Sequence, residues 1–186
     1  MSRLYIALIH YPVTNKHGDT VTTSITPFDV HDIARSALSF GIDHYFVVNP
    51  SKGQKKVVER MIGFWNAGFG KTYNPNRTEA LSIVSHKSTL SEAIQSIETE
   101  INQKPILVST SARLMETKKT INMDKAKKML KEKPLLVLFG TGWGLAPEII
   151  HQSDAILEPI KGVASYNHLS VRAAAAIILH QLANKE

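Results

Sequence analysis

Short apolar runs alternate with helical stretches along this chain, and that alternation constrains its fold more than any other feature. Several runs stay apolar at consecutive positions, which is typical of parallel strands covered on both faces. The predicted strands are residues 4–10, 44–49, 81–84, 106–109, 135–139 and 155–157. The fold class that follows is α/β, a three-layer sandwich with a mostly parallel sheet.

Helical segments are predicted between these strands. Thr26 and Pro27 form a start signal, an N-cap residue followed by proline in the first turn, and Gly41 fits the position just after the helix. The other predicted helices are residues 53–66, 90–102, 124–131 and 169–183. With 186 residues and neither a repeat nor a linker, the chain is expected to form a single domain over residues 1–186.

Three long connections remain, at residues 11–25, 68–78 and 110–123. Long loops in a compact domain are more often functional than idle, so these segments are candidates for binding surfaces. Gly70 and Lys71 in the second loop resemble the end of a phosphate-binding loop. That motif needs another glycine five residues before Gly70, where this chain has Trp65. The second loop is therefore interpreted as the end of a helix.

The net charge of +6 favours an anionic partner such as RNA, DNA or a phosphorylated metabolite. Seven lysines lie between positions 118 and 133, and a second basic group is formed by Lys52, Lys55, Lys56 and Arg60. The alternative interpretation of each group is a solvated helix face.

Several classes of protein are excluded or disfavoured. No window approaches the roughly 18 uninterrupted apolar residues of a membrane span, and the N-terminus is interpreted as a core strand. The chain has no cysteine, which excludes disulfides and thiolate metal sites and agrees with a cytoplasmic location. Histidines and carboxylates do not occur at ligand spacing, so no metal is expected.

The last third of the chain carries the clearest functional signal. A predicted strand at 135–139 runs into a glycine-rich stretch from Gly140 to Leu145, and a second polar loop, residues 157–170, follows another strand. In an open α/β sheet, ligands bind at the carboxyl ends of the strands. Small residues let the main chain approach a ligand closely, so the two loops predict a pocket for a nucleotide-like molecule.

Other interpretations of these loops stay open. Gly140 and Gly142 fit the start of a dinucleotide fingerprint and Glu158 lies near the expected acidic position, but the third glycine comes one residue early. A glycine-rich turn without a ligand is a further possibility. In the second loop, Ser165 or Asn167 is expected to cap the final helix, a role compatible with ligand binding.

Three segments resemble the motifs of the SPOUT superfamily of RNA methyltransferases, in order. They are PFDVHDIARSALSFG at 27–41, LFGTGWGLAPE at 138–148, and PIKG at 159–162 with SYNHLSV at 165–171 and AAAAIIL at 173–179. The resemblance covers about residues 27 to 182. A compact bacterial subgroup that methylates RNA with S-adenosylmethionine (SAM) and lacks an added RNA-binding domain is most similar.

The resemblance implies a C-terminal trefoil knot, a homodimer with its active site at the interface, and an RNA substrate, either tRNA or rRNA. It implies SAM as the cofactor and S-adenosylhomocysteine as the product. Arg35 matches the arginine of the first motif, and the catalytic residues implied are Arg35, Asn167 and Asp29. The cofactor-binding residues implied are Ser109, Thr110, Leu138, Phe139, Gly140, Thr141, Gly142, Ile160, Val163, Ser165, His168 and Leu169.

The acceptor atom, a base nitrogen or a ribose 2′-oxygen, stays open, as does the choice of proton acceptor among Asp29, Asp32 and His168. Two other functions remain as alternatives. One is a basic α/β domain that binds RNA or a nucleotide without catalysis, and the other is a nicotinamide-dependent oxidoreductase.

Overall fold

The computed structural model describes residues 3–115, 117, 119–164 and 166–184. Its main feature is a seven-stranded sheet in the order β5-β4-β1-β8-β6-β9-β7, in which every neighbouring pair is parallel. The strands are β1 (Leu4–Ile9), β4 (His44–Val48), β5 (Val84–Lys87), β6 (Ile106–Thr110), β7 (Thr120–Ile121), β8 (Leu135–Gly140) and β9 (Ala155–Leu157). The predicted α/β class and parallel sheet are confirmed.

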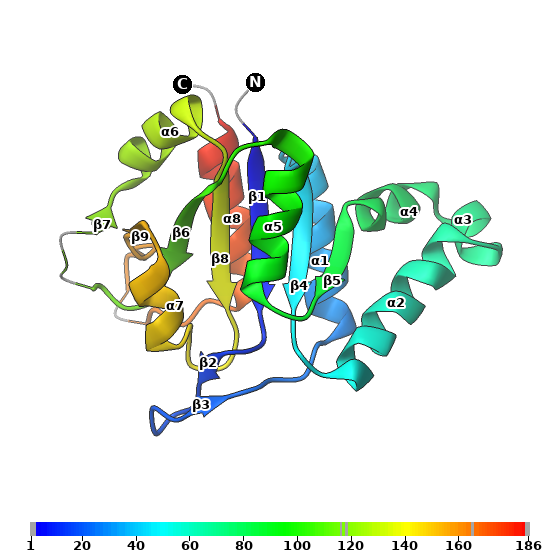
Figure 1. Ribbon diagram of the computed structural model, residues 1–186, viewed down its shortest axis with the longest axis horizontal. Helices are drawn as coiled ribbons and strands as arrows, with labels where there is room; N and C mark the ends of the chain where they lie inside the picture. Colours follow the sequence, from blue (N-terminus) through cyan, green and yellow to red (C-terminus); the bar gives the residue numbers. More distant parts are fainter. Residues whose placement is uncertain (1–2, 116, 118, 165, 185–186) are drawn as a thin grey trace.

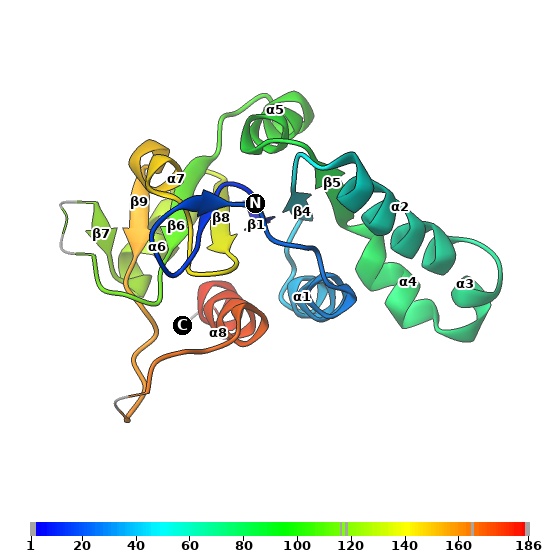
Figure 2. The same cartoon turned by 90° about the horizontal axis from the view of Figure 1, so that it is seen from below.

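Helices cover both faces of this sheet (Figures 1 and 2). One face packs against α1 (Pro27–Ser39), α6 (Met123–Glu132) and α8 (Val171–Ala183), and the other against α5 (Leu90–Ile101) and α7 (Pro147–Gln152). Side chains along β1 point alternately to the two faces of the sheet, so they contribute to two hydrophobic cores, one on each face. Even-numbered residues from Leu4 to Leu8 join the α1 side, and odd-numbered residues from Tyr5 to Ile9 join the α5 side.

Three further helices form an arm at one edge of the sheet. These are α2 (Lys52–Asn66), α3 (Phe69–Tyr73) and α4 (Pro75–Ser82), and they project past β5 in both views (Figures 1 and 2). The predicted strand at 81–84 is therefore wrong. Asn74 caps α4 by accepting a hydrogen bond from the Arg77 N–H at 3.1 Å, and Pro75 occupies the first turn, so Leu81 belongs to a helix and β5 starts at Val84.

The other two long connections also contain regular structure. A small antiparallel hairpin of β2 (Val13–Thr14) and β3 (Thr20–Val21) lies in the first, and β7 lies in the third. Two-residue strands are too short to produce a readable alternation, so the sequence pattern did not indicate them.

The final helix begins two residues later than predicted. Ser170 is its N-cap and accepts a hydrogen bond from the Ala173 N–H at 3.3 Å. The expectation that Ser165 or Asn167 caps this helix is wrong, because the cap side chain must sit directly before the first turn. None of the helices in the described part of the chain has the length and apolarity that a bilayer crossing demands.

Candidate active site

A glycine-rich turn closes the carboxyl end of β8. A Cβ atom at Gly140 would lie 2.6 Å from the backbone nitrogen of Leu145, so only glycine allows this turn to fold back so closely. Gly142 and Gly144 have φ angles of +60° and +113°, a region that other residues rarely adopt. The spacing of the three glycines is thus explained by the turn, and it differs from that of a dinucleotide fingerprint.

The turn is bonded to the β2–β3 hairpin. The N–H of Thr14 donates to the Gly144 carbonyl at 2.9 Å, and the N–H of Trp143 donates to the Thr14 carbonyl at 3.0 Å. The N–H of Gly144 donates to the carbonyl of Thr141 within the turn at 3.1 Å. These bonds fix the turn before any ligand arrives.

A buried chain of side-chain hydrogen bonds supports the same turn from below. The Thr141 hydroxyl donates to the Ile9 carbonyl at 3.0 Å, so it accepts from the Thr23 hydroxyl at 2.6 Å. The Thr23 hydroxyl also shares a hydrogen bond with Nδ1 of His10 at 2.9 Å. Burial lowers the pKa of His10 to about 4, a shift that nearby Asp29 only partly opposes.

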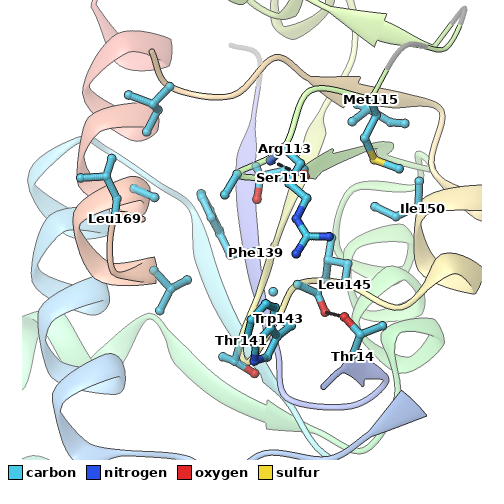
Figure 3. A pocket seen from close by; sticks show the side chains of 18 of the residues that line it. Thr14, Ser111, Arg113, Met115, Phe139, Thr141, Trp143, Leu145, Ile150 and Leu169 are labelled. Atoms are coloured by element: carbon cyan, nitrogen blue, oxygen red, sulfur yellow. Dashed lines mark hydrogen bonds between the residues drawn. The ribbon is translucent and has the colours of Figure 1, made fainter. Parts of the chain in front are cut away.

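A second wall is formed by the segment after β6. The Thr110 hydroxyl donates to the Leu138 carbonyl at 2.9 Å, which joins the ends of β6 and β8. The Arg113 guanidinium lies 6.0 Å from the centre of the Trp143 ring. Figure 3 shows the Arg113 side chain extending into the cavity toward Trp143. This loop therefore brings a cation to a cavity whose lining also includes Lys119, Asp29 and Glu158.

The third wall is the segment between β9 and the start of α8. Its contact with the second wall is the Asn167 side-chain amide, which donates to the carbonyl of Ala112 at 3.0 Å. Ile160 is half-buried against the core, whereas Leu169 is 46% exposed. The three walls enclose an open cavity of about 1160 Å³ at the carboxyl edge of the sheet (Figure 3). Ligand sites of small molecules span roughly 300–1000 Å³, so a nucleoside-sized ligand has room here.

The residues of this cavity fit SAM. Phe139, Leu145, Ile160 and Leu169 provide apolar walls for a planar base. In the described part of the chain, the backbone N–H groups of Gly142, Leu145 and Leu169 donate no hydrogen bond within the protein. The described residues contain no cluster of three or more His, Asp or Glu side chains that could hold a metal ion.

Ten of the predicted site residues line this one cavity. They are Asp29, Thr110, Phe139, Gly140, Thr141, Gly142, Ile160, Asn167, His168 and Leu169. Asp29 is held in place, because its carboxylate accepts from the Thr26 hydroxyl at 2.7 Å and lies 3.5 Å from the Arg172 guanidinium.

Four other predicted residues lie outside the cavity lining. Arg35 is exposed on α1, and Val163 is fully exposed. Ser109 is buried and shares a hydrogen bond with Ser153, and the Leu138 side chain is buried in the core on the α5 side. Ser165 lies outside the described residues.

Sequence analysis missed Arg113, Trp143 and Ile150, which also line the cavity. Trp143 lies inside the glycine-rich stretch that the sequence singled out, so its position among the glycines was an available signal. Arg113 belongs to a loop that was identified only by its length, and no pattern in that loop distinguishes it.

An open parallel α/β sheet with a nucleoside-sized cavity at its carboxyl edge defines a nucleotide-binding class of protein. A family model described as "SAM-dependent RNA methyltransferase" matches residues 3–184. A tRNA (guanine-N(1)-)-methyltransferase of Oleidesulfovibrio alaskensis is 42% identical over 179 residues, which are 96% of this chain and 41% of that protein. The chain therefore belongs to the family of SAM-dependent RNA methyltransferases, and the predicted recognition is confirmed.

The relatives differ in length. The chain spans less than half of the O. alaskensis protein, but an uncharacterised protein of Aquifex aeolicus is 40% identical over 96% of this chain and 87% of its own length. The sequence similar to this chain is thus part of a longer protein in one relative and makes up most of the other.

Solved structures support the fold. The SpoU methyltransferase AviRb of Streptomyces viridochromogenes, in complex with AdoMet, superposes with a TM-score of 0.63 at 17% identity, covering 98% of this chain and 57% of that one. A probable methyltransferase of Bordetella pertussis gives a TM-score of 0.65 at 15% identity, covering 98% and 95%. At such identities the likeness concerns the fold alone.

Proposed function

We propose that this protein methylates tRNA, with SAM bound in the cavity between β6, β8 and α8. The observation that carries the proposal is the coincidence of a prebuilt glycine turn, open main-chain donors and ten predicted residues in one cavity. The tRNA class is supported by the name of the O. alaskensis relative, and the short coverage of that protein makes it a hypothesis for this chain.

SAM would supply a methyl group on a positively charged sulfur, which is already a strong electrophile. In the transfer, the carbon–sulfur bond breaks, a bond from the methyl to an RNA nitrogen or oxygen forms, and the acceptor loses one proton. The protein would mainly orient the two reactants. Phe139, Ile160 and Leu169 would flank the base, and the N–H groups of Gly142 and Leu145 would hold its polar edge.

Asp29 is the proposed proton acceptor. It lines the cavity and its carboxylate is oriented by Thr26 and Arg172. Two alternatives remain: Asp32 is exposed and pairs with Arg172 at 3.3 Å, and His168 lines the cavity but is exposed. The cation at Arg113 is the proposed partner of an anionic group, the carboxylate of SAM or an RNA phosphate.

A homodimer is the proposed assembly. Two exposed aromatic side chains lie near the starts of α1 and α8 in the chain: Phe28, in the first turn of α1, is 68% exposed, and Tyr166, in the segment before α8, is 74% exposed. Arg172 joins α1 and α8 through Asp29 and through the face of Phe28. Solvent-exposed aromatics beside a binding site are typical of an interface. Arg35, on the outer surface of α1, would then serve the cavity of the partner protomer.

Mixing two inactive variants tests this arrangement. Arg35→Ala leaves the cavity intact, and Gly140→Ala damages the cavity but leaves Arg35. If Arg35 acts across the interface, the mixed dimers regain one good site, and random mixing restores about a quarter of the wild-type activity. Activity that stays at the level of the separate variants would remove Arg35 from the partner's site, and a monomer in sedimentation would reject the dimer.

We also propose that the C-terminal part of the chain forms a trefoil knot and that the protein is cytoplasmic. The connection from β9, near one edge of the sheet, to α8, which packs on β8 and α1, supports a threaded segment at residues 158–170. Pulling the chain from both ends in a single-molecule experiment tests it, because a knotted chain stays shorter than its contour length. Immunofluorescence of the tagged protein tests the compartment.

Calorimetry with SAM, S-adenosylhomocysteine and NAD tests the function first. Binding of the two adenosyl ligands without NAD binding is the expected result, followed by transfer of labelled methyl to unmodified tRNA. Nucleoside mass spectrometry of that tRNA then distinguishes a base nitrogen from a ribose oxygen. RNA binding without methyl transfer would favour the non-catalytic alternative. Labelling of rRNA instead of tRNA would mean that the substrate is rRNA.

A further inference from the structure

The arm formed by α2, α3 and α4 carries a ridge of cations that ends in an aromatic side chain. Lys52, Lys56, Arg60 and Phe64 follow one another at intervals of four residues, which places each beside the next in a row that winds along α2. All four are exposed. In the described part of the chain, none of the three cations forms an ion pair, whereas Lys55 pairs with Glu59 at 3.7 Å.

Two more exposed aromatic rings continue beyond this ridge. Phe69 and Tyr73, on α3, are stacked with their centres 5.3 Å apart and an interplanar angle of 23°, and they are 69% and 70% exposed. Phe64 is 55% exposed. Three large rings that remain in solvent on one arm are unusual for a side of a protein that has no partner.

The arm holds these rings on a fixed support. Gly70 packs so closely on α2 that a Cβ atom would overlap the Phe64 carbonyl oxygen. The Thr78 hydroxyl donates to the Trp65 carbonyl at 2.6 Å, and the Arg77 guanidinium lies over the Trp65 ring at 4.7 Å. The exposure of Phe64, Phe69 and Tyr73 is therefore built into the packing of α2 against α3 and α4.

Charge identifies the partner. Residues 51–82 contain six basic and two acidic side chains, so this segment carries four of the six net positive charges of the chain. A second copy of the same face would bring its cations against their own equivalents, which disfavours self-association. Exposed aromatic rings beside unpaired cations instead suit unpaired nucleotides, whose bases stack while their phosphates contact the cations.

We propose that the arm is a binding surface for single-stranded RNA, separate from the SAM cavity, that captures unpaired nucleotides of the substrate. This inference rests on the proposed RNA substrate. The first turn of α2 follows β4 at the carboxyl edge of the sheet, the edge at which the cavity opens (Figure 1). An RNA strand on the ridge is thereby directed toward the reaction site.

The lysines of α6 form the matched control. Lys125, Lys128 and Lys131 are exposed there, but no exposed large apolar side chain accompanies them on this helix. The last turn of α6 lies near the two chain termini, at the end of the molecule away from the β2–β3 hairpin (Figure 1). The same number of charges can thus be removed from either helix.

Fluorescence anisotropy with a labelled 12-nucleotide uridine oligomer tests the surface. K52Q/K56Q/R60Q is expected to reduce the slope of log affinity against log salt by about 2, since each phosphate contact contributes roughly 0.7. Phe69→Leu with Tyr73→Leu is expected to weaken binding about tenfold or more at an unchanged slope, and Phe69→Trp with Tyr73→Trp to retain it. K125Q/K128Q/K131Q is expected to change neither quantity.

Three results would overturn the proposal: arm variants that bind as the wild type does, an α6 variant that loses as much affinity as the ridge variant, or arm variants that dissociate a dimer in sedimentation. Calorimetry with SAM on every variant distinguishes a failure of the proposed RNA-binding surface from a failure of the proposed methyltransferase function. Unchanged SAM binding in the arm variants assigns their defect to RNA capture. If the wild type binds the uridine oligomer but does not bind SAM or transfer its methyl group, the methyltransferase proposal is rejected and the proposed RNA-binding surface on the arm still stands.

Discussion

The turn after β8 and the segment before α8 face each other across the cavity, yet they are built differently. Residues 140–145 are held by main-chain bonds to Thr14 and Ile9 and by the Thr141 hydroxyl. Between residues 159 and 169, the bond from Asn167 to Ala112 is the one hydrogen bond among the described residues. One wall is therefore prebuilt, and its preorganisation reduces the entropy that binding costs. Because the described residues of the other wall form a single hydrogen bond, we expect that wall to adapt to a bound ligand.

Among the substitutions that test the difference between the two walls, replacing Gly140 with alanine is expected to have the largest effect. The new methyl group would meet the Leu145 nitrogen at 2.6 Å, so the prebuilt wall must deform. Overpacking of this kind costs about 3 kcal/mol, and the affinity for SAM should fall at least about a hundredfold. Calorimetry and urea unfolding measure both losses.

Gly63→Ala is the matched control for that substitution. Gly63 lies within α2, and a Cβ atom there meets nothing within 4 Å. Alanine should stabilise the helix by about 0.5–1 kcal/mol and leave SAM binding unchanged. Normal SAM affinity in Gly140→Ala would show that the wall adapts after all.

The buried His10 makes the prebuilt wall sensitive to acid. Its pKa is about 4 in the folded protein, against 6.5 for an ordinary histidine. Between these values the unfolded chain binds a proton that the folded chain does not, so the free energy of unfolding falls as pH falls. The stabilisation is fully present above pH 6.5 and declines by about 3 kcal/mol toward pH 4.

Urea unfolding at pH 7.0, 5.5 and 4.5 measures this decline. Burial also lowers the pKa values of His44 and His86, which act in the same direction. His10→Asn should therefore flatten the pH profile in part. A His10 variant with the full wild-type slope would assign the acid sensitivity to other groups.

The same contrast explains how much could be predicted from sequence. The apolar runs at 4–10 and 135–139 predict β1 and β8 because central parallel strands are buried on both faces. The glycines of the turn were found because tight backbone geometry restricts residue type. Arg113 was not found, since its position depends on how a long loop folds back. Ser109 and Thr110 are adjacent, but their side chains point to opposite sides of β6, so only Thr110 lines the cavity.

Thr141→Val is a smaller change within the prebuilt wall. It keeps the shape of the side chain and removes the hydroxyl that joins Thr23 to the Ile9 carbonyl. The buried partners lose a bond, so the free energy of unfolding should fall by about 2 kcal/mol. Thr141→Ser keeps the hydroxyl and should recover most of that loss. Equal stability of the valine and serine variants would mean that the buried chain contributes little.

Asn167→Ala is expected to have the smallest effect on stability, because it acts on the adaptable wall. The bond to Ala112 is exposed, and its loss should lower the free energy of unfolding by about 0.5 kcal/mol. The free segment then becomes more mobile, so SAM binding should weaken a few-fold through the cost of ordering it. Single-turnover measurements at saturating SAM separate this positioning role from the predicted catalytic role. If the Asn167→Ala variant transfers methyl at the normal rate with saturating SAM, Asn167 only holds the two walls of the cavity together. If the rate stays low although the site is fully occupied by SAM, the amide of Asn167 acts on the reacting groups.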